Sequence, residues 1–196
     1  EHKLKKILAV LTIASALLLT GCSQTNEAAT IGDFKISQTE LQSSIDAVMA
    51  ERAKVDSSQM QLESGEELNR GQLRFKILMH TFDEIAKELK IDVTSSQIGA
   101  KKANILESVG GEAELPKNLV NAAIALQDFD TYVRAIVISE QISQALSQSG
   151  VADEEVSAKV SELLTAKAKT LGVKINPRYG AWDNEAGDVV AANVTG

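Results

Sequence analysis

The sequence predicts a mainly α fold, with a small β element that joins the two ends of the folded part. Between residues 38 and 171, successive segments repeat their apolar residues at the spacing of amphipathic helices, enough for five or six helices. Strand-like segments occur only near the start, at 29–36, and near the end, at 173–182. We therefore expect the C-terminal strand to pair with an N-terminal hairpin and so close the domain.

The expected hairpin opens the folded part. Its two strands flank Gly32-Asp33, a pair typical of a two-residue β-turn. Ser37 and Glu40 then have the spacing of a capping box, in which each side chain satisfies a backbone donor at the start of a helix. The apolar residues of the helix that follows are Leu41, Ile45, Val48, Met49 and Val55.

The second helix is expected from about residue 66 to 90, and a third from a capping box at 94–97 to about 108, where Gly110 favours a helix end. The apolar stripe of the second helix is Leu68, Phe75, Leu78, Met79, Phe82, Ile85, Ala86 and Leu89. Residues 119–146 form a further apolar segment with a break at 128–130.

The last helix is expected over residues 153–171 and should end at Gly172. Residues 173–182 follow as the final strand, where Pro177 suits a strand end. We expect Tyr179 and Trp182 to pack against the helices. The small and acidic residues at 184–196 predict a disordered tail.

Residues 1–21 are organised like a secretory signal peptide. Three lysines at positions 3, 5 and 6 precede an uncharged run over 7–19, and Gly21 provides a small residue before Cys22. The run is shorter than the roughly 20 residues that a membrane-spanning helix needs. Cys22 is the only cysteine, so it has no partner for a disulfide within one chain.

The run Leu19-Thr20-Gly21-Cys22 resembles the bacterial lipobox. This resemblance implies that Cys22 carries diacylglycerol and palmitate and attaches a lipoprotein to the outer face of a cell membrane. Residues 22–28 would then be the lipidated end and a flexible tether, followed by a domain over 29–183. The alternative is an ordinary secreted protein with an incidental cysteine.

Charge and composition exclude several classes of protein. Residues 1–21 hold three of the 20 basic and one of the 27 acidic residues, which leaves 17 basic and 26 acidic side chains and a net charge near −9. Such a balance argues against nucleic acid as a partner. The sequence contains no nucleophile elbow, phosphate loop or dinucleotide fingerprint, and we expect no cofactor.

The candidate catalytic or metal-binding residues have simpler interpretations. His80 is the only histidine after residue 21, and one imidazole makes a poor metal or general-base site, so we expect a helix-surface or boundary histidine. Asp128 and Asp130 could be paired carboxylates. The acidic run 153–155 stands where a helix should start, and there negative charge favours the helix dipole.

Three segments resemble a known family of chaperones. Residues 29–41 are similar to the entry of the SurA N-terminal domain family, and residues 74–98 to its second and third helices. Residues 173–183 resemble the C-terminal strand of PrsA- and SurA-type foldases. The resemblance covers most of 29–183, and PrsA-like proteins share the lipoprotein signal.

The resemblance implies an ATP-independent chaperone that binds unfolded or newly exported proteins near the membrane. The parvulin isomerase domain of PrsA and SurA has no counterpart, because only residues 147–172 lie in that interval. We therefore expect no catalysis. A PrsA-like peptidyl-prolyl isomerase is one alternative, and an adaptor lipoprotein with one defined envelope partner is another.

Phe75, Met79 and Phe82 are the candidate client-binding residues. A flexible surface of methionine and aromatic side chains accommodates varied clients. The alternative is that this stripe of the second helix is simply core.

Overall fold

The structure is a computed structural model that describes residues 26–192. The expected signal peptide, Cys22 and residues 193–196 lie outside the described residues. The helices are α2 (Gln38–Arg52), α3 (Gly65–Leu89), α4 (Ser95–Val109), α5 (Leu115–Asn121), the 3₁₀ helix η1 (Leu126–Asp128), α6 (Phe129–Gln148) and α7 (Asp153–Leu171). The strands are β1 (Glu27–Ile31), β2 (Phe34–Ser37), β3 (Val173–Ile175), β4 (Ala181–Asp183) and β5 (Asp188–Val190). The mainly α fold with a small β element is confirmed.

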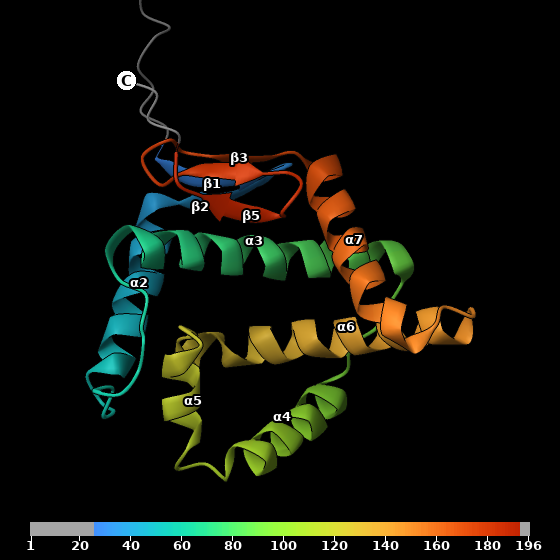
Figure 1. Ribbon diagram of the computed structural model, residues 1–196, viewed down its shortest axis with the longest axis horizontal. Helices are drawn as coiled ribbons and strands as arrows, with labels where there is room; N and C mark the ends of the chain where they lie inside the picture. Colours follow the sequence, from blue (N-terminus) through green and yellow to red (C-terminus); the bar gives the residue numbers. More distant parts are fainter. Residues whose placement is uncertain (1–25, 193–196) are drawn as a thin grey trace, which may run out of the picture.

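Helix α3 runs through the middle of the molecule (Figure 1). The strands lie along one side of it, whereas α6 lies along the opposite side, with α4 beyond α6. Helix α2 stands at one end of α3, and α7 crosses near the other end. The long α3 therefore separates a β layer from a helical layer.

The two ends of the chain meet in a three-stranded antiparallel sheet with the order β2-β1-β3. Ala29 is in register with Ile175, and Ile31 with Val173. The inward side of this sheet is fully apolar, with Ile31 and Ile36 at most 1% exposed. The expected pairing of the C-terminal strand with the N-terminal hairpin is thus confirmed.

The expected disordered tail is wrong for residues 184–192. They turn back and form β5, which pairs with β4 in a separate two-stranded sheet. The Asp183 carboxylate accepts hydrogen bonds from the backbone N–H groups of Glu185 (2.8 Å) and Ala186 (3.0 Å), which fixes the turn. Val189 is only 5% exposed and joins the core cluster beneath the sheet. A short segment with a single buried valine gives little sequence signal, and its position depends on contacts of Val189 and Asp188 with distant residues.

The helix boundaries follow the local sequence closely. The Thr94–Gln97 capping box is complete, whereas at Ser37 only the serine half forms, with Oγ accepting from Glu40 N–H at 3.0 Å. The Glu40 carboxylate instead lies 3.7 Å from the Lys76 ammonium on α3. The predicted break at 128–130 is present as η1 and the start of α6.

Candidate functional site

Two adjoining cavities lie between α3 and the helical layer. The larger measures about 410 Å³ and lies between α3 and the segment that joins α5 to η1. The smaller measures about 230 Å³ and lies beside the start of α6. Phe75 and Met79 of α3 line both, so the cavities meet at these two side chains. We call the pair of cavities the α3 groove.

The floor of the α3 groove is apolar. Phe75, Leu78 and Met79 come from successive turns of α3 and are each only partly buried. Ile124 and Tyr132 face them from the α5–η1 link and from α6. Partly covered aromatic and methionine side chains in a concave surface are typical of sites that bind apolar groups.

One wall of the groove is the loop that precedes α3. Arg52 Nη1 donates a hydrogen bond to the Glu63 carbonyl oxygen at 2.6 Å. Gly71 leaves room for the Glu63 carboxylate, because a Cβ at this position would overlap it. Residues 61–63 are therefore held against α3 at the rim of the groove.

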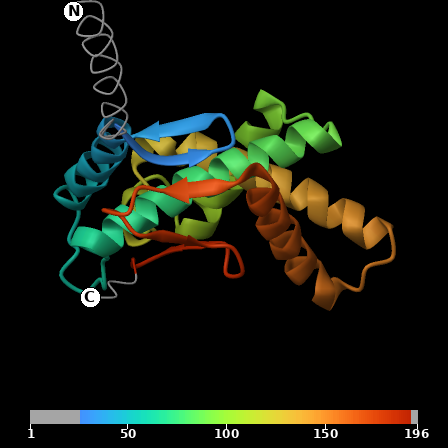
Figure 2. The ribbon, with the colours of Figure 1, turned by 90° about the horizontal axis from the view of Figure 1, so that it is seen from above.

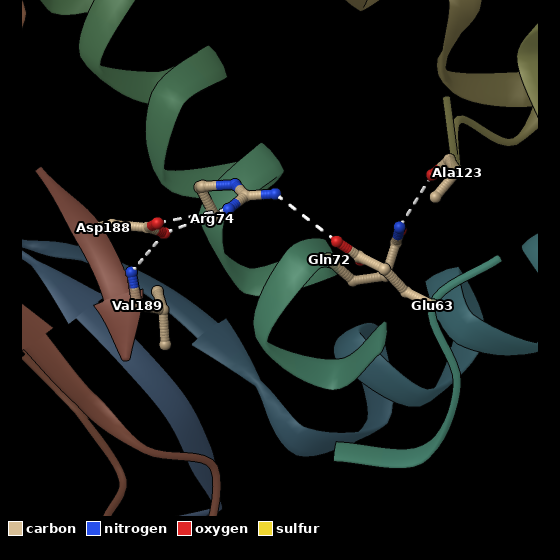
Figure 3. Close-up of polar contacts among 6 residues, drawn as sticks. All are labelled: Glu63, Gln72, Arg74, Ala123, Asp188 and Val189. Atoms are coloured by element: carbon tan, nitrogen blue, oxygen red, sulfur yellow. Dashed lines mark hydrogen bonds and ion pairs between the residues drawn. The ribbon is translucent and has the colours of Figure 1, made fainter. Parts of the chain in front are cut away.

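Arg74 links this wall to the C-terminal hairpin (Figure 3). Its Nη1 lies 3.2 Å from each carboxylate oxygen of Asp188 in β5, and its Nη2 lies 3.8 Å from Glu63 Oε1. All three side chains are partly exposed, so the ion pairs themselves add little stability. Their effect is to fix the position of the loop relative to α3 and β5.

The opposite wall of the groove is the link between α5 and η1, which is held by the buried side-chain amide of Gln72. Gln72 is 2% exposed, and its Nε2 donates a hydrogen bond of 2.8 Å to the carbonyl oxygen of Ala123 (Figure 3). Ala123 has a φ of +53°, a left-handed conformation that disfavours a residue with a Cβ. The Gln72 amide therefore stabilises a strained turn in the link that carries Ile124.

The smaller cavity also contains titratable groups. Burial lowers the pKa of His80 below its usual value, and the Glu84 carboxylate opposes this shift. The imidazole stacks on Phe34 of β2, with ring centroids 4.2 Å apart. Burial raises the pKa of Asp128, against the influence of Lys76. The titratable groups come from α3 and η1 and form no nucleophile–base pair.

The structure brings two of the three candidate client-binding residues together. Phe75 and Met79 meet in the α3 groove, whereas Phe82 packs against the cluster around Ile85 and Ile138. Phe82 lies farther along α3, where α7 covers the helix. We therefore leave Phe82 out of the site.

The other candidate residues from the sequence form ion pairs, a helix start or core contacts. Asp130 is 2.6 Å from the Lys102 ammonium and is not paired with Asp128. The acidic run 153–155 forms the first turn of α7. Tyr179 and Trp182 pack against the core beneath the sheet, as expected.

Sequence reasoning missed Ile124 and Tyr132. Both lie in or next to the short segments around η1, where no periodic pattern indicates which side chains face α3. Gln72 was missed as well, because a glutamine within an amphipathic helix is normally placed on the solvent side. Only its bond to Ala123 reveals its role.

Two further observations concern residues 26–192. None of their helices is both long enough and apolar enough to cross a bilayer. Nowhere in this range do three or more His, Cys, Asp or Glu side chains gather in a way that could hold a metal ion.

The fold and the groove together define a mainly α domain, closed by its terminal strands, with a concavity of mixed apolar and polar lining beside its central helix. No protein-family model matches the chain, and no curated protein or solved structure matches it either. The similarity to the SurA N-terminal domain family stays a prediction from the residues that carry it.

Proposed function

We propose that this protein is a membrane-anchored extracytoplasmic chaperone that holds apolar segments of unfolded or newly exported proteins in the α3 groove, without ATP or catalysis. The observation that carries the proposal is that Phe75 and Met79 are both partly exposed in a groove between the 61–63 loop and the α5–η1 link. Partly covered apolar side chains favour weak, adaptable contacts with many sequences over one tight ligand.

The proposed location rests on the sequence around Cys22. A basic start, an apolar run and a small residue before the sole cysteine are the features of a lipoprotein signal. A lipid on Cys22 would keep the groove close to the place where exported chains emerge. The resemblance of 29–41, 74–98 and 173–183 to SurA- and PrsA-type proteins supports the same function.

The proposed binding of unfolded proteins in the groove is tested with the chain that begins at Cys22. We expect it to suppress the aggregation of a chemically unfolded test protein at low molar excess. Met79→Glu should raise the concentration needed for half suppression about tenfold, the equivalent of about 1.4 kcal/mol, because a charge in an apolar contact is costly. Met49→Glu is the matched control, since Met49 is 50% exposed on α2 and lines neither cavity of the α3 groove.

A photo-crosslinking residue tests the same contact without adding a charge. Placed at position 79, it should capture the unfolded test protein, whereas at position 49 it should not. Equal capture at both positions, or equal suppression by both glutamate variants, would contradict the assignment of the groove.

The anchor is tested separately. In a bacterial host, the full chain should incorporate labelled palmitate and sediment with membranes, and Cys22→Ser should abolish both. The isomerase alternative predicts turnover of a proline-containing peptide by the purified chain, and we expect none. The adaptor alternative predicts a single crosslinked partner in envelope extracts in place of a broad set.

A further inference from the structure

A second surface of the molecule, the outer face of the β2-β1-β3 sheet, carries an unusual concentration of basic side chains. Thr30 in the central strand is in register with Lys35 on one side and Lys174 on the other. Neighbouring residues such as Ile36 and Ile175 pack into the core. Because side chains alternate along a strand, the two lysines project outward, on the side away from α3. Figure 2 shows that no helix within residues 26–192 covers this side of the sheet.

A cleft of about 580 Å³ opens at the end of this face. Asn26, Glu27 and Thr30 line it from the N-terminal side, and Lys174 and Arg178 from the C-terminal side. Arg178 is held there by a hydrogen bond of 3.1 Å from its Nη1 to Gln38 Oε1. Its guanidinium also lies 5.4 Å from the centre of the Tyr179 ring. The cleft therefore combines open volume with an oriented guanidinium and an exposed ammonium.

The local charge is opposite to that of the chain. Lys35, Lys174 and Arg178 stand against one carboxylate, Glu27, which lies 2.6 Å from the Lys35 ammonium. Asp33 is at the hairpin turn, the end of β1 away from Asn26. The chain without residues 1–21 has a net charge near −9. A basic face on an acidic protein is complementary to an anionic surface.

The position of this face relative to Cys22 suggests which anionic surface it meets. Cys22 precedes Asn26 by four residues, and a chain extends by at most about 3.5 Å per residue, so the two lie within about 14 Å of each other. Asn26 lines the basic cleft. A lipid on Cys22 would thus bring the cleft within reach of the headgroup layer.

We propose that the basic outer face of the sheet docks on the anionic phospholipids of the membrane, with a headgroup phosphate held in the cleft between Lys174 and Arg178. The proposal rests on the lipidation of Cys22 in the proposed function. Docking in this orientation places the sheet against the bilayer and α6 on the opposite side of α3 (Figure 1). The larger cavity, which is lined by α3, the α5–η1 link and Tyr132 of α6, then lies away from the membrane. The lipid on Cys22 would attach the domain, and the basic face would fix its orientation on an anionic surface.

The test uses the chain from Cys22, with this cysteine alkylated by a single 14-carbon chain in vitro. Partition is measured into vesicles of phosphatidylcholine, with and without 30% phosphatidylglycerol. Lys174→Gln combined with Arg178→Gln should weaken binding to the anionic vesicles about 25-fold, or about fivefold for each basic side chain. Binding to neutral vesicles should not change, and 0.5 M salt should remove the difference.

The matched control is Lys117→Gln combined with Lys169→Gln. These lysines are exposed on α5 and α7, and their replacement removes the same charge elsewhere. An equal loss of binding in the control would overturn the docking face, since only net charge would then matter. The docking face would also be overturned if the Lys174/Arg178 variant bound anionic vesicles as tightly as wild type does.

Inorganic phosphate distinguishes a membrane site from a site for the free ion. If 10 mM phosphate raises the melting temperature while vesicle binding is the same for wild type and variant, the cleft binds free phosphate, and the membrane assignment is overturned. Because the acyl chain is attached chemically, this experiment is independent of whether cells lipidate Cys22. It is also independent of chaperone activity in the groove.

Discussion

The two sides of α3 are packed very differently. Toward the sheet, Leu73 and Ile77 are completely buried and contact a dense cluster formed with both ends of the chain. Toward the helical layer, Phe75 and Met79 are only partly covered and line cavities. One helix thus serves as core on one side and as a candidate binding surface on the other.

Within the helical layer, α4 is less tightly held than α6, in which Val133 and Ile138 are completely buried. Helix α4 has no fully buried residue and contacts the rest through partly buried Ile98 and Ile105. Two lysines of α4 form surface ion pairs with α6, which contribute little to stability. Regions with few buried contacts open at low free-energy cost. We infer that the sheet side and the α3–α6 contact fix the fold, while α4 is the helix that opens most readily.

The largest expected effect comes from deleting residues 173–196. The deletion removes the β1–β3 pairing and Val189 from the core beneath the sheet. We expect a loss of at least about 5 kcal/mol from a total that is typically about 5–15 kcal/mol, so that the cooperative melting transition disappears. Truncation after Ala192 is the control. An unchanged transition in the longer deletion would show that the sheet does not fix the fold.

The next largest effect is the loss of unfolding free energy when one apolar side chain is shortened in each layer. Leu73→Ala leaves a cavity in the sheet-side cluster and should cost about 2–5 kcal/mol of unfolding free energy. Ile105→Ala, on the partly exposed face of α4, should cost about 1 kcal/mol. Urea denaturation measures both. Equal losses would mean that the two layers are equally well packed.

A pair of glycines sharpens the comparison. Gly180 has a φ of +135°, and a Cβ there would overlap the carbonyl oxygen of Val190, so Gly180→Ala should cost about 1–3 kcal/mol. Gly99 lies within α4 with no atom near its missing Cβ. Gly99→Ala should therefore stabilise the protein by about 0.5–1 kcal/mol. Thermal denaturation checks that the two substitutions have opposite signs.

The smallest effect depends on pH. Burial raises the pKa of Asp128 beside the groove, so the folded state binds its proton more tightly than the unfolded state does. The stability that this extra proton affinity contributes is therefore fully present below the ordinary carboxyl pKa. It is lost as the pH rises through the raised pKa of Asp128 in the folded state. Asp128→Asn should become more stable relative to wild type between pH 3 and pH 7, as measured by urea denaturation at both values. A relative loss over that range would contradict the burial of this carboxyl group.

The sequence was sufficient for the helices and the closing strand, because those depend on local signals. Thr94 marks a helix start through the hydrogen bonds of its capping box, and Gly110 and Gly172 mark helix ends through their left-handed backbone conformation. The β5 strand was not predictable, because it depends on contacts of Val189 and Asp188 with α3, more than 100 residues earlier.

The candidate site was predictable only in part for the same reason. Phe75 and Met79 follow from the apolar stripe of α3, but the same stripe includes Phe82, which is also partly buried and lines neither cavity. Periodicity shows which face of a helix is apolar, and not which neighbours cover each turn of it. Ile124 joins the groove through a strained turn that depends on the Gln72 amide.

The pairing of β1 with β3 has a consequence for the order in which the protein folds. Ala29 finds its partner in Ile175 only after nearly the whole chain has been synthesised. Until then, the apolar inward side of the first hairpin has only part of its final covering. Contacts between such distant residues slow folding and prolong the exposure of apolar surface. Strand β3, which is made late, thus completes the sheet that β1 and β2 begin.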